Sequence, residues 1–237
     1  MNRYSIVLAA LLTGFGLLLG YAGAQENPVT AINITLEPDA TMIQHAEAAN
    51  ALLRQDFPTG YALDATHRPH ITMLQRFVRT ADLDELYAVV DDVLDGQKTA
   101  GLTLKAVKYD YVISDKVGVT AILIERTDEL VKLQQRLIDA VAPFAVKTGT
   151  VDAFFTTPDD PDINQHTVDD VTRYVPDSTG TKFNPHLTVG VAPPDDLKKM
   201  VAEPFEAFTF TPTALSVYQL GNFGTARKKL EAWELKP

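Results

Sequence analysis

The chain has 237 residues, of which 46% are hydrophobic and 22% charged. This composition is typical of a folded globular protein and excludes a collagen, a coiled coil or a disordered chain. The 21 Lys and Arg residues against 31 Asp and Glu residues give a formal net charge of -10, and a surface of this sign repels long nucleic acids except at a local basic pocket. There is no cysteine, which excludes disulfides, thiolate zinc sites and a cysteine nucleophile.

The first residues have the pattern of a secretory signal peptide. Arg3 precedes an apolar run over 6–19, and Ala-Gly-Ala at 22–24 has the small side chains of a cleavage site. We therefore predict a signal peptide over 1–24 that is cleaved after Ala24. The mature protein is then periplasmic or secreted and has no contact with a membrane. The alternative is an uncleaved anchor, but the run is shorter than the roughly 20 residues that a spanning helix needs.

Beyond this peptide, short strands alternate with amphipathic helices. Apolar residues with a period of two predict strands, and apolar residues at helical spacing predict helices. The expected strands cover 31–36, 70–78, 102–113, 117–125, 186–191, 208–210, 214–220 and 228–235. The expected helices cover 39–57, 80–96, 127–143 and 194–201. Because several strand pairs are hairpins, we predict an α+β fold with antiparallel pairing rather than a doubly wound parallel sheet.

Residues 145–183 interrupt this regular order. They contain turn-forming residues and one short expected helix over 165–174, so we interpret the segment as an insertion or lid in a single domain over 25–237. Asp160-x-Asp162-x-Asn164 opens like a calcium loop. However, Gln165 stands at the sixth position in place of Gly and Val171 at the twelfth in place of Glu, so the calcium-loop template fails and the charges indicate a solvated turn.

The most informative feature is a short repeat. Pro69-His70-Ile71-Thr72-Met73 returns as Pro185-His186-Leu187-Thr188-Val189, and both copies begin an expected strand. In a strand, His and Thr two residues apart point to the same face, while the aliphatic residues enter the core. If the two strands lie side by side about a pseudo-twofold axis, one groove is lined by two imidazoles and two hydroxyls.

Such a set suits displacement at phosphorus without a metal or another cofactor. Imidazole titrates near neutral pH, so one His can accept a proton while the other donates one. Threonine hydroxyls can hydrogen-bond the non-bridging phosphate oxygens without adding charge.

At these residues the sequence resembles the 2H phosphoesterases, which include the bacterial 2′-5′ RNA ligase-like proteins and the 2′,3′-cyclic nucleotide phosphodiesterases. His70-Ile71-Thr72-Met73 and His186-Leu187-Thr188-Val189 match both His-hydrophobic-Ser/Thr-hydrophobic motifs of that family. The resemblance implies a bilobal fold with two pseudo-symmetric antiparallel-sheet lobes around a central cleft. It implies His70 and His186 as the catalytic pair, and Thr72 and Thr188 as ligands of the substrate phosphate.

We therefore expect a monomeric phosphodiesterase that hydrolyses 2′,3′-cyclic nucleotides or short oligonucleotide phosphodiesters, with reversible 2′-5′ ligation as a secondary activity. Stable binding of long nucleic acid is not expected. One alternative is a nucleotide-binding module without turnover. Another is a metal-dependent hydrolase in which His67 and His70 are ligands, although residues three apart in an extended chain point to opposite faces.

Two further sets of side chains are candidates for substrate contacts. Basic residues near the motifs or the insertion are candidates for holding an anion, namely Arg68, Arg76, Arg173 and Lys182. Aromatic residues are candidates for stacking a base, namely Phe77, Tyr111, Phe155 and Tyr174.

Overall fold

The computed structural model describes residues 28–95, 101–114 and 116–235. The predicted signal peptide lies outside the described residues. The strands are β1 (Val29–Pro38), β2 (Ile71–Arg79), β3 (Leu104–Ser114), β4 (Val117–Ile124), β5 (Ala145–Val146), β6 (His186–Ala192), β7 (Phe208–Phe210), β8 (Pro212–Leu220) and β9 (Ala226–Glu234). The helices are α1 (Ala40–Asp56), α2 (Leu83–Asp95), α3 (Asp128–Val141), α4 (Gln165–Ser178) and α5 (Pro194–Ala202), with five short 3-10 turns between elements.

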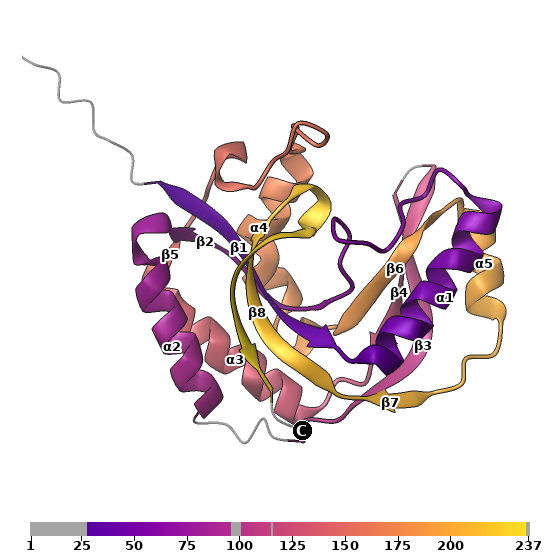
Figure 1. The fold of residues 1–237 in the computed structure, drawn as a ribbon, viewed down its shortest axis with the longest axis horizontal. Coiled ribbons are helices and arrows are strands. Elements are labelled where there is room, and N and C mark those ends of the chain that lie inside the picture. Colours follow the sequence, from indigo (N-terminus) through magenta and orange to yellow (C-terminus); the bar gives the residue numbers. More distant parts are fainter. Residues whose placement is uncertain (1–27, 96–100, 115, 236–237) are drawn as a thin grey trace, which may run out of the picture.

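All nine strands belong to one antiparallel sheet in the order β7-β3-β4-β6-β2-β1-β8-β9, and the short β5 pairs with β2. The α+β class with antiparallel pairing is therefore confirmed. The two sheets expected for a bilobal chain are the two halves of this one strongly curled sheet (Figure 1). One half contains β7, β3, β4 and β6, and the other contains β2, β1, β8 and β9.

Helices pack against both halves. In Figure 1, α2 and α3 lie beside the half that holds β2, whereas α1 and α5 lie beside the half that holds β6. Asp39 and Thr127, the first residues of two expected helices, are the N-caps of α1 and α3, because their side chains accept hydrogen bonds from backbone N–H groups of the first turn. No helix in the described part of the chain is long and apolar enough to span a membrane.

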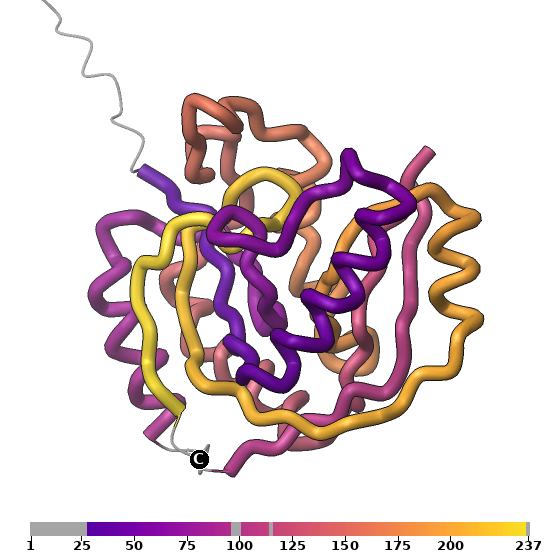
Figure 2. The backbone as a smooth tube through the Cα atoms, turned by 45° about the vertical axis from the view of Figure 1, so that its right-hand side comes forward, coloured from indigo at the N-terminus to yellow at the C-terminus, as the bar shows by residue number. Residues whose placement is uncertain are grey.

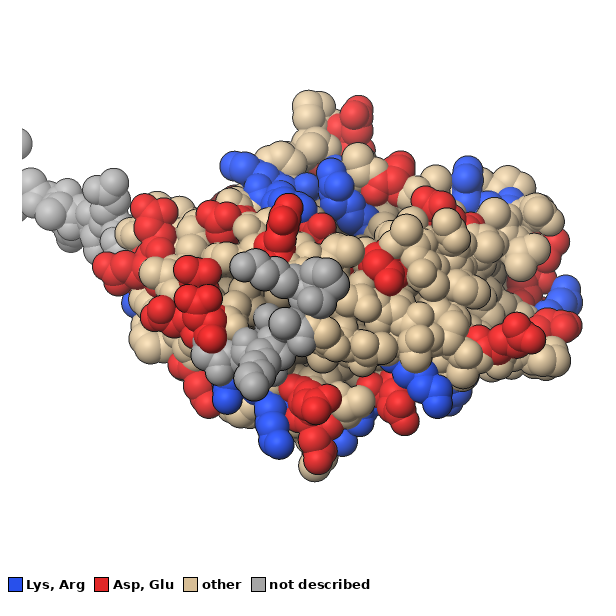
Figure 3. Space-filling view, turned by 60° about the horizontal axis from the view of Figure 1, so that its bottom comes forward, with Lys and Arg blue, Asp and Glu red and all other residues tan. Residues whose placement is uncertain are grey.

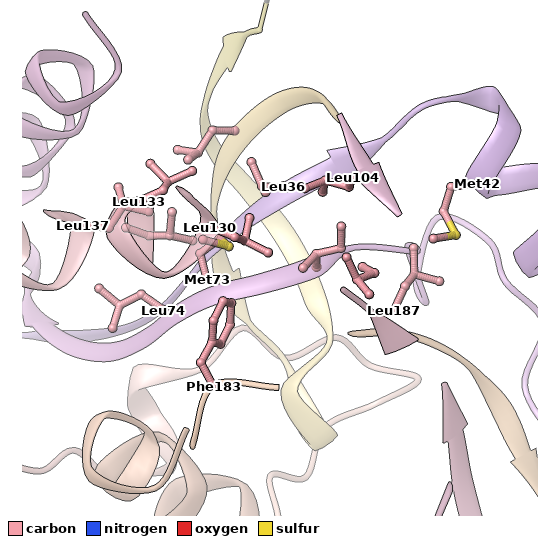
Figure 4. Packing of buried hydrophobic residues seen from close by; sticks show 14 of the residues in the cluster. Leu36, Met42, Met73, Leu74, Leu104, Leu130, Leu133, Leu137, Phe183 and Leu187 are labelled. Atoms are coloured by element: carbon pink, nitrogen blue, oxygen red, sulfur yellow. The ribbon is translucent and has the colours of Figure 1, made fainter. Parts of the chain in front are cut away.

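One large hydrophobic cluster joins the two halves. Leu130, Leu133 and Leu137 recur along one face of α3 and point toward Met73 and Leu74 of β2 (Figure 4). The same cluster includes Leu187 of β6 and Met42 of α1. The core therefore lies behind both motif strands and holds their aliphatic residues, which leaves the His and Thr side chains on the opposite face.

Most boundaries lie within a few residues of the expected ones. The expected strand 70–78 is β2, which begins at Ile71, and the expected strand 186–191 is β6, which begins at His186, so Pro69 and Pro185 precede the strands. A proline has no N–H to donate to the ladder, whereas its carbonyl can still accept, as that of Pro185 does from Ile124. Helix α4 runs to Ser178 rather than 174 and includes Pro176 in its last turn. The short strand β5 was not predicted.

Candidate functional site

The two motif strands meet at the centre of the sheet. Ile71 of β2 pairs with Leu187 of β6 in an antiparallel register, and both side chains are fully buried. This is the one residue pair that joins β2 to β6 in the described structure. The strands therefore touch at a single point and diverge on either side of it.

The four residues predicted from the repeat lie around this point. Side chains alternate along a strand, so His70 and Thr72 face away from the core, as do His186 and Thr188. Extending the antiparallel register by one residue in each direction sets His70 opposite Thr188 and Thr72 opposite His186. The single Ile71–Leu187 pair thus relates the two motifs by an approximate local twofold axis.

A β-bulge repeats at the same place in both motifs. The register of β2 against β1 skips Met73, and the register of β6 against β4 skips Val189. These are the fifth residues of the two five-residue patterns. A bulge bends its strand and redirects the neighbouring side chains. The two motifs therefore have the same local distortion of the backbone at the same position.

Both imidazole rings are oriented by a backbone carbonyl two residues upstream. The Nδ1 atom of His70 lies 2.7 Å from the Arg68 carbonyl oxygen, and that of His186 lies 2.8 Å from the Asn184 carbonyl oxygen. A carbonyl only accepts, so Nδ1 carries the proton in each ring. The Nε2 atom of each neutral ring is then the lone-pair nitrogen, which is free for proton transfer.

The environment of His70 favours its neutral form. The side-chain amide of Asn33 donates to Nε2 of His70 at 3.3 Å, and Asn33 is itself fully buried on β1. Burial is the largest cause that lowers the pKa of His70 below its usual value, and the neighbouring His186 adds to it. The Arg68 carbonyl and the Glu37 carboxylate act in the opposite direction but do not outweigh burial.

The two halves of the site differ in what lies beside the histidines. Leu36 pairs with Ile71, so the next residue of β1, Glu37, is beside His70. On the other half, Leu123 of β4 pairs with His186. One histidine therefore has a carboxylate beside it and the other an aliphatic side chain, which breaks the pseudo-symmetry.

Glu37 is held by three donors. Its carboxylate accepts hydrogen bonds from the hydroxyls of Ser216 at 2.6 Å and Tyr218 at 2.7 Å, and it forms an ion pair with Lys229. Burial raises the pKa of Glu37, but the bonds from Lys229, Ser216 and Tyr218 outweigh it, and the net pKa lies below the usual value. Burial, together with the same contact, raises the pKa of Tyr218. Glu37 is thus an ionised group, and all three of these contacts reach its Oε1 atom.

Two pockets flank the Ile71–Leu187 pair. The first, here named the His70 pocket, has a volume of about 320 Å³ and is lined by His70 together with Glu37, Glu47, Asp64, Arg68 and Tyr218 among others. The second, the Thr72 pocket, has a volume of about 340 Å³ and is lined by Thr72 and His186 together with Gln75, Asp170, Arg173, Asp177 and Lys182 among others. Each pocket therefore contains one of the two histidines.

The candidate cations are divided between the pockets. Arg68 lines the His70 pocket, while Arg173 and Lys182 of the 145–183 segment line the Thr72 pocket. Arg76 lines neither of these two pockets. The face drawn in Figure 3 has acidic and basic side chains interspersed, without a continuous basic surface on the residues shown in colour. The His70 pocket therefore contains one of the four candidate cations and the Thr72 pocket two.

The four aromatic candidates for base stacking lie in different surroundings. Phe77 is buried in a second hydrophobic cluster, and Tyr174 donates its hydroxyl to the Thr72 carbonyl at 3.3 Å. Tyr111 packs against the main core, and Phe155 lies 5.8 Å from the Lys228 ammonium. Tyr174 lines the Thr72 pocket, and the other three line neither pocket.

The metal alternative finds no support in the placement of its residues. The His67 ring stacks on Tyr61 at 4.3 Å and contacts Asp64 and Thr66, whereas both ring nitrogens of His70 are engaged by other groups. Within residues 28–95, 101–114 and 116–235, no three His, Asp or Glu side chains converge as metal ligands.

Three residues of the site had no signal in the sequence. Asn33, Glu37 and Tyr218 are ordinary polar residues of strands β1 and β8, and no motif marks them. They reach His70 only because β1 lies between β2 and β8. Alternation along the expected strand 31–36 would place Asn33 on the face of Thr35, but it does not indicate which histidine that face meets.

A curled antiparallel α+β sheet with paired His-x-Thr motifs at its centre has the features of a two-histidine phosphoesterase. The comparison with family models agrees with this class: the 2′-5′ RNA ligase superfamily matches residues 37–222, which include both motifs. The chain therefore belongs to the 2′-5′ RNA ligase superfamily.

Solved structures with a similar fold include Escherichia coli LigT complexed with ATP, at 13% identity over 89% of this chain and 99% of that chain, with a TM-score of 0.46. Another is Usb1 of Kluyveromyces marxianus, at 10% identity over 89% of this chain and 99% of that chain, with a TM-score of 0.45. The comparison with curated proteins gave no significant match.

Proposed function

We propose that this protein is a metal-independent phosphodiesterase that hydrolyses a 2′,3′-cyclic nucleotide or the end of a short oligonucleotide. The observation that carries the proposal is the Ile71–Leu187 pair, because it brings both His-x-Thr motifs to one point with their polar side chains on one face. Thr72 and Thr188 hold the non-bridging phosphate oxygens, and His70 and His186 move the protons.

The hydrogen bonds and the pKa direction support a division of labour. His70 is the general base, because its Nε2 carries a lone pair and the surroundings disfavour its charged form. It takes a proton from a water molecule whose oxygen attacks phosphorus. His186 is the general acid: it enters the reaction with protons on both ring nitrogens, gives the Nε2 proton to the sugar oxygen as the P–O bond breaks, and keeps the Nδ1 proton on the Asn184 carbonyl. The Asn33 bond to His70 is long enough for the attacking water to replace it.

The charge and the pocket sizes support a small substrate. The net charge of -10 opposes a long polyanion, and pockets of about 320 and 340 Å³ are at the lower end of the range for small-molecule sites. We further propose that the protein acts as a monomer, without a cofactor, and that ligation is the reverse reaction at high product concentration.

The experiment is hydrolysis of a panel of 2′,3′-cyclic nucleotides by the purified full chain with a chelator present. His70→Ala and His186→Ala should each lower kcat by about 10²- to 10⁴-fold. His45→Ala is the matched control, since His45 stacks on Phe208 at 3.8 Å and lines neither pocket. Activity that disappears with the chelator, or that survives both substitutions, would refute the two-histidine mechanism. Binding without turnover would favour the nucleotide-binding alternative.

We also propose export with cleavage after Ala24, on the pattern of the first 24 residues. The test is expression in a bacterium followed by fractionation and N-terminal sequencing. A mature chain that begins at Gln25 in the periplasm or medium is the expected result, and an intact N-terminus in the cytoplasm contradicts it.

A further inference from the structure

A buried carboxamide lies behind each of the two bulges. Gln134 stands among leucines on the buried face of α3, and its side-chain nitrogen donates to the Met73 carbonyl at 3.1 Å. Asn50 stands on the buried face of α1, and its side-chain nitrogen donates to the Val189 carbonyl at 2.8 Å. Met73 and Val189 are the two residues that the strand registers skip. Since a bulge leaves its extra residue unpaired in the ladder, each amide provides a hydrogen bond at the point where the ladder is interrupted.

The same nitrogen of each amide also holds the wall of a pocket. That of Gln134 donates to the Ser178 carbonyl at 3.3 Å, and Ser178 lines the Thr72 pocket. That of Asn50 donates to the Tyr61 carbonyl at 3.0 Å. The side-chain oxygen of Asn50 accepts from the N–H of Leu63 at 3.3 Å, and Leu63 lines the His70 pocket. Each amide therefore joins the bulge of one motif strand to the wall of one pocket.

Burial and close packing fix both amides. Gln134 is 1% exposed and Asn50 is 5% exposed, and a buried amide without its hydrogen bonds would be costly. A Cβ added to Gly190 would lie 2.8 Å from a methyl carbon of Leu53 and 3.2 Å from the side-chain nitrogen of Asn50, so β6 and α1 approach closely at the bulge. Figures 1 and 2 show α1 alongside β6 in both views. The position of each bulge is therefore set by the helix packed behind it.

Gln134 acts on the half of the site that contains Thr72. Met73 directly follows Thr72 in β2, and the carbonyl of Thr72 itself accepts from the Tyr174 hydroxyl at 3.3 Å. Two successive carbonyls are thus held by side chains of α3 and α4. A shift of this backbone would move the Thr72 hydroxyl relative to a bound phosphate, and a misplacement of about 1 Å can cost a factor of about 10² in rate.

Asn50 acts in the same way on the other half of the site. Val189 directly follows Thr188 in β6, and the register sets Thr188 opposite His70. The wall that Asn50 holds, at Leu63, belongs to the pocket that contains His70. One amide thus connects the strand of Thr188 to the wall beside its opposed histidine.

We propose that Gln134 and Asn50 are a pair of positioning residues, which hold the hydroxyls of Thr72 and Thr188 at the two non-bridging oxygens of the substrate phosphate. The inference rests on the proposed function and deepens it, because each threonine depends on its own amide and not on the other. Neither amide lines either of the two pockets, so both act through the backbone rather than by contact with the substrate.

The test is a pair of double-mutant cycles on kcat/KM for adenosine 2′,3′-cyclic phosphate. Gln134→Met and Asn50→Leu nearly keep the size of the side chain and remove its hydrogen bonds, and each alone should lower kcat/KM by about ten-fold to one-hundred-fold. Added to Thr72→Val, Gln134→Met should cost less than about three-fold more, because the hydroxyl that it positions is already absent. Added to Thr188→Val, it should keep its full effect. Asn50→Leu should show the reverse pattern.

Two controls separate positioning from a loss of stability. Leu86→Ala opens a cavity in the core at α2, so it should unfold at a lower denaturant concentration and keep kcat/KM. Gln135→Met changes the exposed neighbour of Gln134, whose side chain bonds to Asp139 of the same helix, and it should change neither property. If an apolar variant does not fold, Gln134→Glu or Asn50→Asp replaces it, since a buried carboxyl is protonated and keeps one donor.

Additive losses in both cycles, coupling of an amide to the opposite threonine, or full activity of both single variants would overturn this inference while the proposed function stood. If the wild type hydrolyses no cyclic nucleotide, the proposed function fails, and the same cycles are measured on calorimetric binding of inorganic phosphate. Coupling of Gln134 to Thr72 and of Asn50 to Thr188 supports the positioning role. Additive effects, or no binding, refute it.

Discussion

The side-chain nitrogen of Asn33 donates a hydrogen bond to the Nε2 atom of His70, 3.3 Å away. The side-chain oxygen of Asn33 is buried without a hydrogen-bond partner. The ring nitrogen accepts because Nδ1 of the same ring carries the proton that binds the Arg68 carbonyl. A buried polar atom without a partner is uncommon and costly. The Asn33 side chain thus stabilises the neutral form of His70 that has its lone pair on Nε2, and Asn33 is in this sense a positioning residue.

Substitution of Asn33 should move the pH dependence of the reaction. Asn33→Ala removes the donor to the neutral ring, and Asn33→Asp places a carboxylate beside it, so both raise the pKa of His70. In the wild type this pKa is lower than the usual 6.5, and the acidic limb of kcat/KM lies below that pH. We expect the limb to move to higher pH in both variants, and further in Asn33→Asp. Profiles from about pH 5 to about pH 8 measure it, and an unchanged limb would show that Asn33 does not act on His70.

Thr35 provides a stability prediction. Its hydroxyl is fully buried and has no hydrogen-bond partner. Thr35→Val keeps the shape of the side chain and removes the unpaired hydroxyl, so we expect unfolding to cost about 1 kcal/mol more than in the wild type. Urea unfolding measures the difference. A loss of stability of similar size would mean that a buried water pairs with this hydroxyl.

Glu37 should make the free energy of unfolding depend on pH in the acid range. Its pKa is lower in the folded protein than its usual value of 4.5, so the stability it contributes is present above pH 4.5 and is lost as the pH falls through the folded pKa. Glu37→Gln should lower stability at neutral pH by about 1 kcal/mol and should flatten the acid dependence. Denaturant titrations at neutral and acid pH test this against Glu47→Gln, a change at an exposed residue of α1. Parallel acid curves for wild type and Glu37→Gln would contradict it.

The hydroxyl of Thr72 should matter more than its methyl group. Thr72→Val removes the donor to the phosphate oxygen and should lower kcat/KM by about 10²-fold, whereas Thr72→Ser should retain most of the activity. Thr35→Val is the matched control, because Thr35 pairs with Thr72 in the neighbouring strand and contacts no substrate in the proposed mechanism. Equal losses in the Val and Ser variants would assign Thr72 a packing role instead.

The sequence was informative wherever the chemistry is local. The repeat of Pro-His-aliphatic-Thr-aliphatic identified His70, Thr72, His186 and Thr188, because strand alternation places His and Thr on one face whatever the rest of the fold. The caps Asp39 and Thr127 were likewise predictable, since a cap bonds to backbone within the first turn of its own helix. The antiparallel α+β class followed from the hairpin spacing.

The tertiary structure alone decided what depends on contacts between distant segments. That Ile71 meets Leu187, and that Glu37 rather than an aliphatic residue lies beside His70, depends on strand order, which hydrophobic periodicity does not encode. The fold also decided which stacking candidate lies in the site, because Phe77 is buried in the second hydrophobic cluster whereas Tyr174 of α4 lines the Thr72 pocket. The repeated motif specifies which groups can react, and the pairing of the strands determines the different surroundings that set their roles.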